Sequence, residues 1–330
     1  MRREFPSEVL KVWLYAAASV WLGAWVSPLI YNAGKALAEV SSVKQTNGPL
    51  QWLAGICRAA EFPSFFAASL LGSAVLLFLP FLHWLQTRSA PDEGRHPPNR
   101  LRSWNGGQRL NNNPRGLRQA AGGFLSVTVV FSGIAAGLIL AGVYAWRNPA
   151  GLLATIALRG FTTALGLAVF QEFLFRGIAL GIFLRAMRPL AAISLSALLF
   201  ALVHFLIPPP GLNVLDPDAS GVGFELLRKI ASRLSEPRII LGTLTPLFAL
   251  GAVLAYARWR TASLYLSIGL HTGWIFVNAV LASVLVAAQR PSLLSGPSLQ
   301  QGLIPLAGIL LAGVFTYHLT GNDDATDAPA

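Results

Sequence analysis

Long apolar runs separated by shorter polar connections dominate the chain. Hydropathy predicts about eight of them, at residues 10–31, 64–85, 123–146, 161–184, 189–207, 239–257, 262–286 and 299–318. Each run contains the roughly 20 apolar residues that a helix needs to cross about 30 Å of hydrocarbon. Because an open sheet edge would leave backbone groups without hydrogen bonds in lipid, these runs must be helices. The pattern therefore predicts an all-α, polytopic membrane helix bundle of about eight transmembrane helices.

Composition agrees with a membrane protein and disfavours other classes. Only 12% of the 330 residues are charged, whereas a soluble domain carries about 25%. The net charge of +11 comes mostly from Lys and Arg in the connections between apolar runs, which is typical of membrane topology rather than of a nucleic-acid groove. The single cysteine, Cys57, excludes an intrachain disulfide and a multi-cysteine metal site. We expect the lipid bilayer as a partner and no nucleic acid.

We predict three parts along the chain. Residues 1–122 hold the first two membrane helices and a basic loop with seven arginines, Thr87–Gln119; residues 123–320 form the core; residues 321–330 form an acidic, disordered tail. With the N-terminus inside, cytoplasmic segments hold 14 Lys and Arg residues and external segments ten. This bias predicts cytoplasmic N- and C-termini, as in a protein of the bacterial inner membrane.

Two further features concern packing. Small residues such as those of Gly133-Ile-Ala-Ala-Gly137 permit close approach of membrane helices. The external stretch 208–237 opens with three prolines, which end the preceding helix. It then has apolar residues at helical spacing with charges opposite, which predicts a short helix lying at the membrane interface.

The polar side chains of Glu172, Arg176, His204 and His271 lie within three of these apolar runs. A charge at mid-membrane costs roughly 2.5–3.5 kcal/mol on insertion scales, so such residues usually have a function. Glu172 and Arg176 are four residues apart and can pair along one helix face. At 1.5 Å per residue, Glu172, His204 and His271 lie about 20, 22 and 15 Å from the cytoplasmic ends of their helices. We therefore predict that they converge in one layer.

A carboxylate and two imidazoles allow several kinds of site. They suit general acid–base chemistry, in which the carboxylate takes a proton from water and a histidine stabilises an oxyanion or protonates the leaving group. Glu172, His204 and His271 with a water also match a catalytic zinc ligand set, although we favour a site without a cofactor. The same groups could relay protons in a transporter, or Glu172 and Arg176 could be a structural ion pair.

The polar motifs resemble those of a known family. Gln171-Glu172-Phe-Leu-Phe-Arg176, Phe200-Ala-Leu-Val-His204 and His271-Thr-Gly-Trp-Ile275 follow in order on three predicted helices. This is similar to the E-E-x-x-x-R, F-x-x-x-H and H-x-x-x-N motifs of the CPBP intramembrane proteases. That family includes the type II CAAX prenyl endopeptidases and bacterial Abi-type proteins. The likeness covers about residues 161–278.

The resemblance implies a glutamate-dependent endopeptidase that hydrolyses peptide bonds of a membrane-associated peptide or protein. In the family, the first glutamate of the pair activates water, and the histidines and the asparagine form the oxyanion side of the site. Carried over by motif, His204 and His271 take the histidine positions, Glu172 the second glutamate and Arg176 the arginine.

This chain departs from the family pattern at two positions. Gln171 replaces the first glutamate, and an amide cannot act as a general base. Glu172 cannot simply substitute, because neighbouring helix residues point about 100° apart. Ile275 replaces the asparagine, and the loss of one oxyanion donor costs roughly 100- to 1000-fold in rate. Asn278 shares the face of His271 but lies about 10 Å further along the helix.

Three hypotheses follow. The chain is a divergent protease in which a local helix deformation brings Glu172 to the water. Alternatively, it is a non-catalytic membrane scaffold or peptide-binding protein with the same fold. A proton-coupled transporter is less favoured, because the sequence shows no inverted repeat. For the protease, the candidate catalytic residues are Glu172, His204, His271, Arg176 and Gln171.

Overall fold

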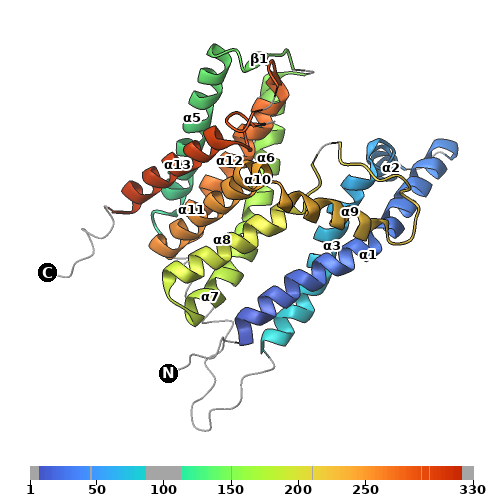
Figure 1. Ribbon diagram of the computed structural model, residues 1–330, viewed down its shortest axis with the longest axis horizontal. Helices are drawn as coiled ribbons and strands as arrows, with labels where there is room; N and C mark the ends of the chain where they lie inside the picture. Colours follow the sequence, from blue (N-terminus) through green and yellow to red (C-terminus); the bar gives the residue numbers. More distant parts are fainter. Residues whose placement is uncertain are drawn as a thin grey trace, which may run out of the picture. The chain divides into compact units, whose positions relative to one another are not determined.

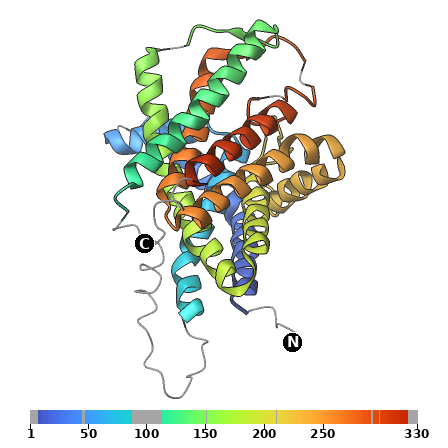
Figure 2. The same cartoon turned by 90° about the vertical axis from the view of Figure 1, so that its left-hand side faces the viewer.

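The computed structural model describes residues 7–44, 47–86, 113–149, 151–209, 211–290, 292–296 and 298–321 (Figures 1 and 2). Most of the predicted basic loop, and the predicted acidic tail after Gly321, lie outside these residues. The longer helices are α1 (Ser7–Val43), α2 (Gly48–Ala59), α3 (Phe62–Gln86), α5 (Gly116–Leu140), α6 (Leu153–Glu172), α8 (Pro189–Phe205), α9 (Val222–Ser232), α11 (Thr245–Thr261), α12 (Tyr265–Val284) and α13 (Leu303–Gly321).

The predicted fold class is confirmed: the chain is an all-α, polytopic helical bundle. Among the described residues, six helical segments are long and apolar enough to cross a membrane. They are α1, α3, α5, the segment Leu153–Ala186, the segment Pro237–Thr261 and α12. The predicted spans at 189–207 and 299–318 correspond to the shorter apolar helices α8 and α13.

The chain forms two compact units. Unit 1 contains residues 1–92 and 203–236, and unit 2 contains residues 93–202 and 237–330. In this clustering α9 packs against α1 and so joins residues 203–236 to the N-terminal helices, while the predicted parts 1–122, 123–320 and 321–330 stay a prediction.

Unit 1 is built on α1, which packs along α3 and α2. Two lysines of α1 hold the C-terminal ends of these helices: Lys11 Nζ donates to the Trp84 carbonyl at 2.9 Å, and Lys35 Nζ donates to the Ala60 carbonyl at 2.7 Å. Such contacts satisfy carbonyls that have no partner within the helix. The predicted short amphipathic helix is α9, whose buried face includes Leu226 and Ile230.

In unit 2, α12 packs against α5, α6 and α11. Glycines allow the close approach of α5 and α12. A Cβ at Gly269 would overlap the Ala120 carbonyl, and a Cβ at Gly273 would lie 2.7 Å from the Phe124 carbonyl oxygen. The prediction of close packing at Gly133 and Gly137 is wrong, because both lie on the exposed side of α5 with no atom within 4 Å of an added Cβ.

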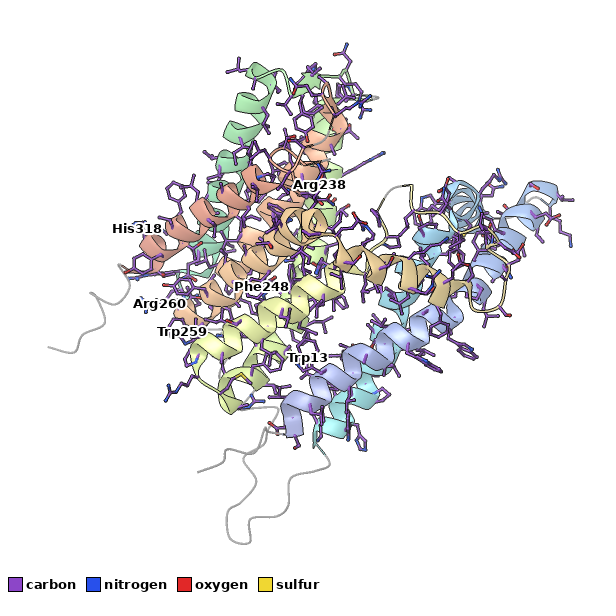
Figure 3. The ribbon with its side chains drawn as sticks, in the orientation of Figure 1. Trp13, Arg238, Phe248, Trp259, Arg260 and His318 are labelled. Atoms are coloured by element: carbon purple, nitrogen blue, oxygen red, sulfur yellow. The ribbon has the colours of Figure 1, made fainter. Side chains whose placement is uncertain are left out.

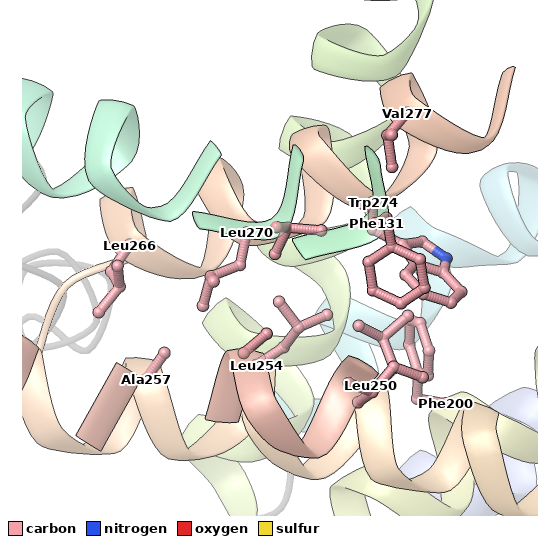
Figure 4. Close-up of a cluster of buried hydrophobic side chains, with 12 residues drawn as sticks. Phe131, Phe200, Leu250, Leu254, Ala257, Leu266, Leu270, Trp274 and Val277 are labelled. Atoms are coloured by element: carbon pink, nitrogen blue, oxygen red, sulfur yellow. The ribbon is translucent and has the colours of Figure 1, made fainter. Parts of the chain in front are cut away.

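An apolar cluster fills the space between α5, α8, α11, α12 and α13 (Figure 4). The rings of Phe131 and Trp274 meet edge to face, with centroids 4.9 Å apart. Phe200 of α8 belongs to the same cluster and is almost fully buried. The cluster supports one side of the polar centre described below, because Phe200 contacts both.

The helix predicted for residues 123–146 ends at Leu140. Gly142 has a φ of +69°, a left-handed conformation that ends helices. The chain then forms strand β1 (Tyr144–Trp146), which pairs antiparallel with β2 (Leu285–Ala287) directly after α12. These three-residue strands join the ends of α5 and α12.

In the described part of unit 2, two π-helical segments interrupt the predicted α-helices. The segment η1 (Phe173–Ala179) lies between α6 and α7 (Leu180–Ala186). The segment η3 (Ile240–Leu244) lies between the short helix α10 (Pro237–Ile239) and α11. Together α10, η3 and α11 form the helical segment Pro237–Thr261. Figure 3 shows Arg238 at one end of this segment, and Trp259 and Arg260 at the other. The polar residues of the predicted first motif lie at η1.

Candidate active site

Glu172 is the last residue of α6 and directly precedes η1. Its side chain is fully buried, as is that of Arg176 within η1. Arg176 Nη1 donates to Glu172 Oε1 at 3.0 Å. The ion pair expected from the four-residue spacing is therefore present, within an otherwise apolar segment.

Arg176 is held by two further groups from other helices. Its Nη2 donates to the carbonyl oxygen of Gly251 in α11 at 3.1 Å. Its guanidinium lies 4.4 Å from the centroid of the Phe200 ring, a cation–π contact. The lack of a side chain at Gly251 lets α11 lie close to α8, since an added Cβ would be only 3.0 Å from Ala197 Cα in α8. Without such partners a buried guanidinium would be strongly destabilising.

His271 of α12 completes the centre. Its Nδ1 lies 2.7 Å from Glu172 Oε1, although the two residues are 99 positions apart. The imidazole is almost fully buried, and its ring lies edge to face with Phe200 at 5.7 Å. One carboxylate oxygen thus meets both Arg176 and His271. We call Glu172, Arg176 and His271 the polar centre.

Gln171 and His204 are the two remaining candidate residues. Gln171 is half-buried, and its Oε1 has no hydrogen-bond partner among the described residues; the same is true of Glu172 Oε2. His204 lies in the last turn of α8, is partly buried and belongs to unit 1. A role for His204 and Gln171 in the site stays a prediction.

Ile275, at the expected position of the third-motif asparagine, and Asn278 both make contacts within the helix bundle. Ile275 lies one turn after His271 and packs against the apolar cluster. Asn278 is buried, and its Nδ2 donates to the Trp274 carbonyl at 2.8 Å. Neither residue contributes a side-chain hydrogen bond to the polar centre in the described part of the chain.

In the polar centre, the carboxylate of Glu172 and the imidazole of His271 contact each other. A catalytic zinc takes three protein ligands that point at one metal position. Here Glu172 Oε1 and His271 Nδ1 point at each other, and the same oxygen already accepts from a guanidinium. No three His, Cys, Asp or Glu side chains in the described ranges are grouped to hold a metal ion. Zinc at Glu172, His204 and His271 stays a hypothesis.

Comparison with known families identifies one part of the chain. The family model described as type II CAAX prenyl endopeptidase Rce1-like matches residues 153–277. Residues 153–277 form an Rce1-like domain. The Rce1-like domain runs from the start of α6 through most of α12, so it contains the whole polar centre. No curated protein and no solved structure matches the chain. The resemblance inferred from the motifs is confirmed, and with its apolar helices the chain is an integral membrane protein.

Sequence reasoning missed one partner of the Rce1-like domain's polar centre. The carbonyl of Gly251 binds Arg176 but carries no residue-type signal, since every residue has a carbonyl. The available signal was indirect: Gly251 is a glycine in an apolar helix, where a neighbouring helix can approach the backbone.

Proposed function

We propose that the chain is a CPBP-family intramembrane endopeptidase that hydrolyses a peptide bond of a membrane-associated peptide or protein. We further propose that it works in the bacterial inner membrane with both termini in the cytoplasm. The observation that carries the proposal is the contact of Glu172 with both Arg176 and His271 in a fully buried position. It joins the first and third motifs of the Rce1-like domain in one centre.

A purely structural role would not favour such a centre. Replacement of a buried ion pair by apolar residues of similar size is often neutral or stabilising. Ionisable groups kept inside a membrane helix bundle are therefore functional candidates. A carboxylate and an imidazole in contact also supply what amide hydrolysis needs, a group that takes a proton from water and later returns it to the leaving nitrogen.

The segment η1 supports the divergent form of the protease. A π-helical turn changes the direction of the side chains that follow it, and such turns are frequent at functional sites. Here η1 starts directly after Glu172 and contains Arg176. A local helix deformation at this point is what a chain with Gln171 in place of the first glutamate requires.

The second candidate function is a non-catalytic scaffold that binds membrane peptides. The observation that favours it is the packing of Ile275 in the apolar cluster, where the family has a hydrogen-bond donor. With Gln171, two of the family's motif positions lack their usual chemistry.

The test is cleavage of a membrane-peptide library by the purified full-length protein in liposomes. We expect wild type to cleave and His271→Asn to lose at least about 100-fold in rate, because general acid–base groups contribute about 100- to 10,000-fold. The matched control is His83→Asn at an exposed position of α3, which should cleave like wild type. A chelator should not change the rate of wild type.

Two outcomes would contradict the protease. If wild type binds peptides without cleaving them, the non-catalytic scaffold is the correct function. If only Gln171→Glu cleaves, the fold supports proteolysis but the natural chain does not perform it.

A further inference from the structure

The hydrogen bonds of the polar centre assign a proton position on His271. A guanidinium stays protonated in proteins, so Arg176 is a permanent cation with three donor nitrogens. Its Nη1 lies 3.0 Å from Glu172 Oε1, with both side chains fully buried. This buried cation requires a counter-charge, and Glu172 supplies it as a carboxylate.

An ionised carboxylate only accepts hydrogen bonds. His271 Nδ1 at 2.7 Å from Oε1 must therefore be the donor, because two lone pairs would repel each other at that distance. In a neutral imidazole with a proton on Nδ1, the other nitrogen, Nε2, carries the lone pair. The contact with Glu172 thus selects one tautomer of His271.

We propose that His271 Nε2 is the general base of this site and that Glu172 is a positioning residue that orients it. The proposal rests on the proposed function and names the group that receives the proton. It differs from the role that the family resemblance implies, in which the first glutamate of the pair activates water.

The charges of Glu172 and His271 decide which of the two takes the proton from water. A proton on Glu172 would neutralise the carboxylate and leave Arg176 buried without its counter-charge, which is strongly unfavourable. A proton on His271 instead produces an imidazolium in direct contact with a carboxylate, and opposite charges stabilise each other there. Gln171, at the family's position for the base, carries an amide that takes no proton.

The proposed reaction is balanced without a co-reactant. An O–H bond of water breaks and its proton moves to Nε2, while the water oxygen forms a bond to the peptide carbonyl carbon. The carbonyl electron pair moves onto oxygen. The tetrahedral intermediate then re-forms the C=O bond, the C–N bond breaks, and the leaving nitrogen takes the proton from Nε2. Throughout, Glu172 stays ionised between Arg176 and His271.

The first test reads the tautomer and needs no activity. Full-length protein labelled with ¹⁵N-histidine in lipid nanodiscs is studied by long-range ¹H–¹⁵N correlation, and the His271 signals are those lost in His271→Asn. We expect the Nδ1–H tautomer in wild type and in Arg176→Lys, which keeps the counter-charge. In Glu172→Gln we expect a mixture of tautomers. An Nε2–H tautomer in wild type would overturn the proposal.

The second test joins the tautomer to cleavage. Loss of the carboxylate that orients a catalytic histidine costs about 10,000-fold in kcat in a serine protease, and we expect a loss of about 1,000-fold or more in Glu172→Gln. The control is Glu225→Gln, which removes a partly exposed carboxylate paired with Lys229 at the same four-residue spacing. It should leave both cleavage and the His271 signals unchanged.

Two results would separate the possible failures. If Glu172→Gln keeps the cleavage rate of wild type, Glu172 does not position the base and our assignment is wrong. If wild type shows the Nδ1–H tautomer but cleaves nothing, the proposed function fails, and with it the base role.

Discussion

The two π-helical segments of unit 2 differ in the cause of their distortion. The segment η3 is followed by Pro246, which has no N–H, so the Gly242 carbonyl four residues earlier has no α-helical donor. That carbonyl instead accepts from the Gly302 N–H at 2.7 Å. The Thr245 hydroxyl donates to the Ile240 carbonyl at 2.9 Å. The distortion at η3 therefore has a local cause in the sequence.

The segment η1 contains no proline. Its contacts are instead tertiary: Arg176 binds Glu172 at its start and the Gly251 carbonyl of α11, and Phe200 of α8 covers the guanidinium. An unusual backbone persists only where the surrounding structure stabilises it. A π-helix without a local cause in the sequence therefore indicates tertiary contacts that hold it, here those of the candidate active site.

Removal of the charge that holds η1 should have the largest effect on stability. We expect Arg176→Met to lower the free energy of unfolding by about 3–5 kcal/mol, because it leaves Glu172 as a buried charge without its cation. The double variant Glu172→Leu, Arg176→Met should recover most of this loss. Unfolding of the purified protein in detergent micelles measures both.

The control for this prediction is the partly exposed pair of Glu225 and Lys229 on α9, which has the same spacing and a 2.8 Å contact. Lys229→Met should cost only about 0.3–0.5 kcal/mol, as for solvent-accessible helix pairs at this spacing. Equal losses in Arg176→Met and Lys229→Met would show that the buried pair does not hold η1.

A smaller loss of stability should follow when the packing of α8 and α11 around Arg176 is changed without changing a charge. In Gly251→Ala, the new Cβ would lie 3.0 Å from Ala197 Cα and 3.2 Å from Phe200 Cδ1. The Ala197 Cα is a backbone atom and cannot move without moving its helix, so α8 and α11 must separate slightly. We expect a loss of about 1–3 kcal/mol in unfolding free energy. Amide exchange of residues 173–179 should also accelerate.

Gly133→Ala is the matched control, since nothing lies within 4 Å of its added Cβ. It should be neutral or stabilising by up to about 1 kcal/mol, because alanine favours helices more than glycine does. If both alanine variants behave alike, the approach of α8 to α11 at Gly251 does not support η1.

The fold class could be predicted from the sequence, whereas the packing could not. Runs of about 20 apolar residues predict membrane helices for a general physical reason. Which glycines allow close packing depends on the face that meets a neighbour, and the sequence does not distinguish Gly133 on the exposed side of α5 from Gly269 against Ala120. The end of α5 likewise depends on Gly142 and on pairing of β1 with β2, a contact between distant segments.

For the candidate site, spacing predicted the pair of Glu172 and Arg176, and depth along the helices predicted that His271 lies near them. The atoms involved could not be predicted. That one oxygen, Glu172 Oε1, accepts from both partners depends on how η1 and α12 meet. A backbone acceptor such as Gly251 leaves no mark in a motif, because motifs record side chains only.

The smallest effect should come from removal of the local cause at η3. In Pro246→Ala the new N–H can donate to the Gly242 carbonyl, which has a second lone pair for Gly302. This gain opposes the loss of proline's restriction on the unfolded chain, worth about 0.4–1 kcal/mol. We therefore expect a net change below about 1 kcal/mol in the free energy of unfolding. Amide exchange should become slower in residues 240–244 and should stay unchanged in residues 173–179. A change in amide exchange at η1 would contradict the separate causes of the two π-helical segments, because it would make both of them parts of one coupled distortion.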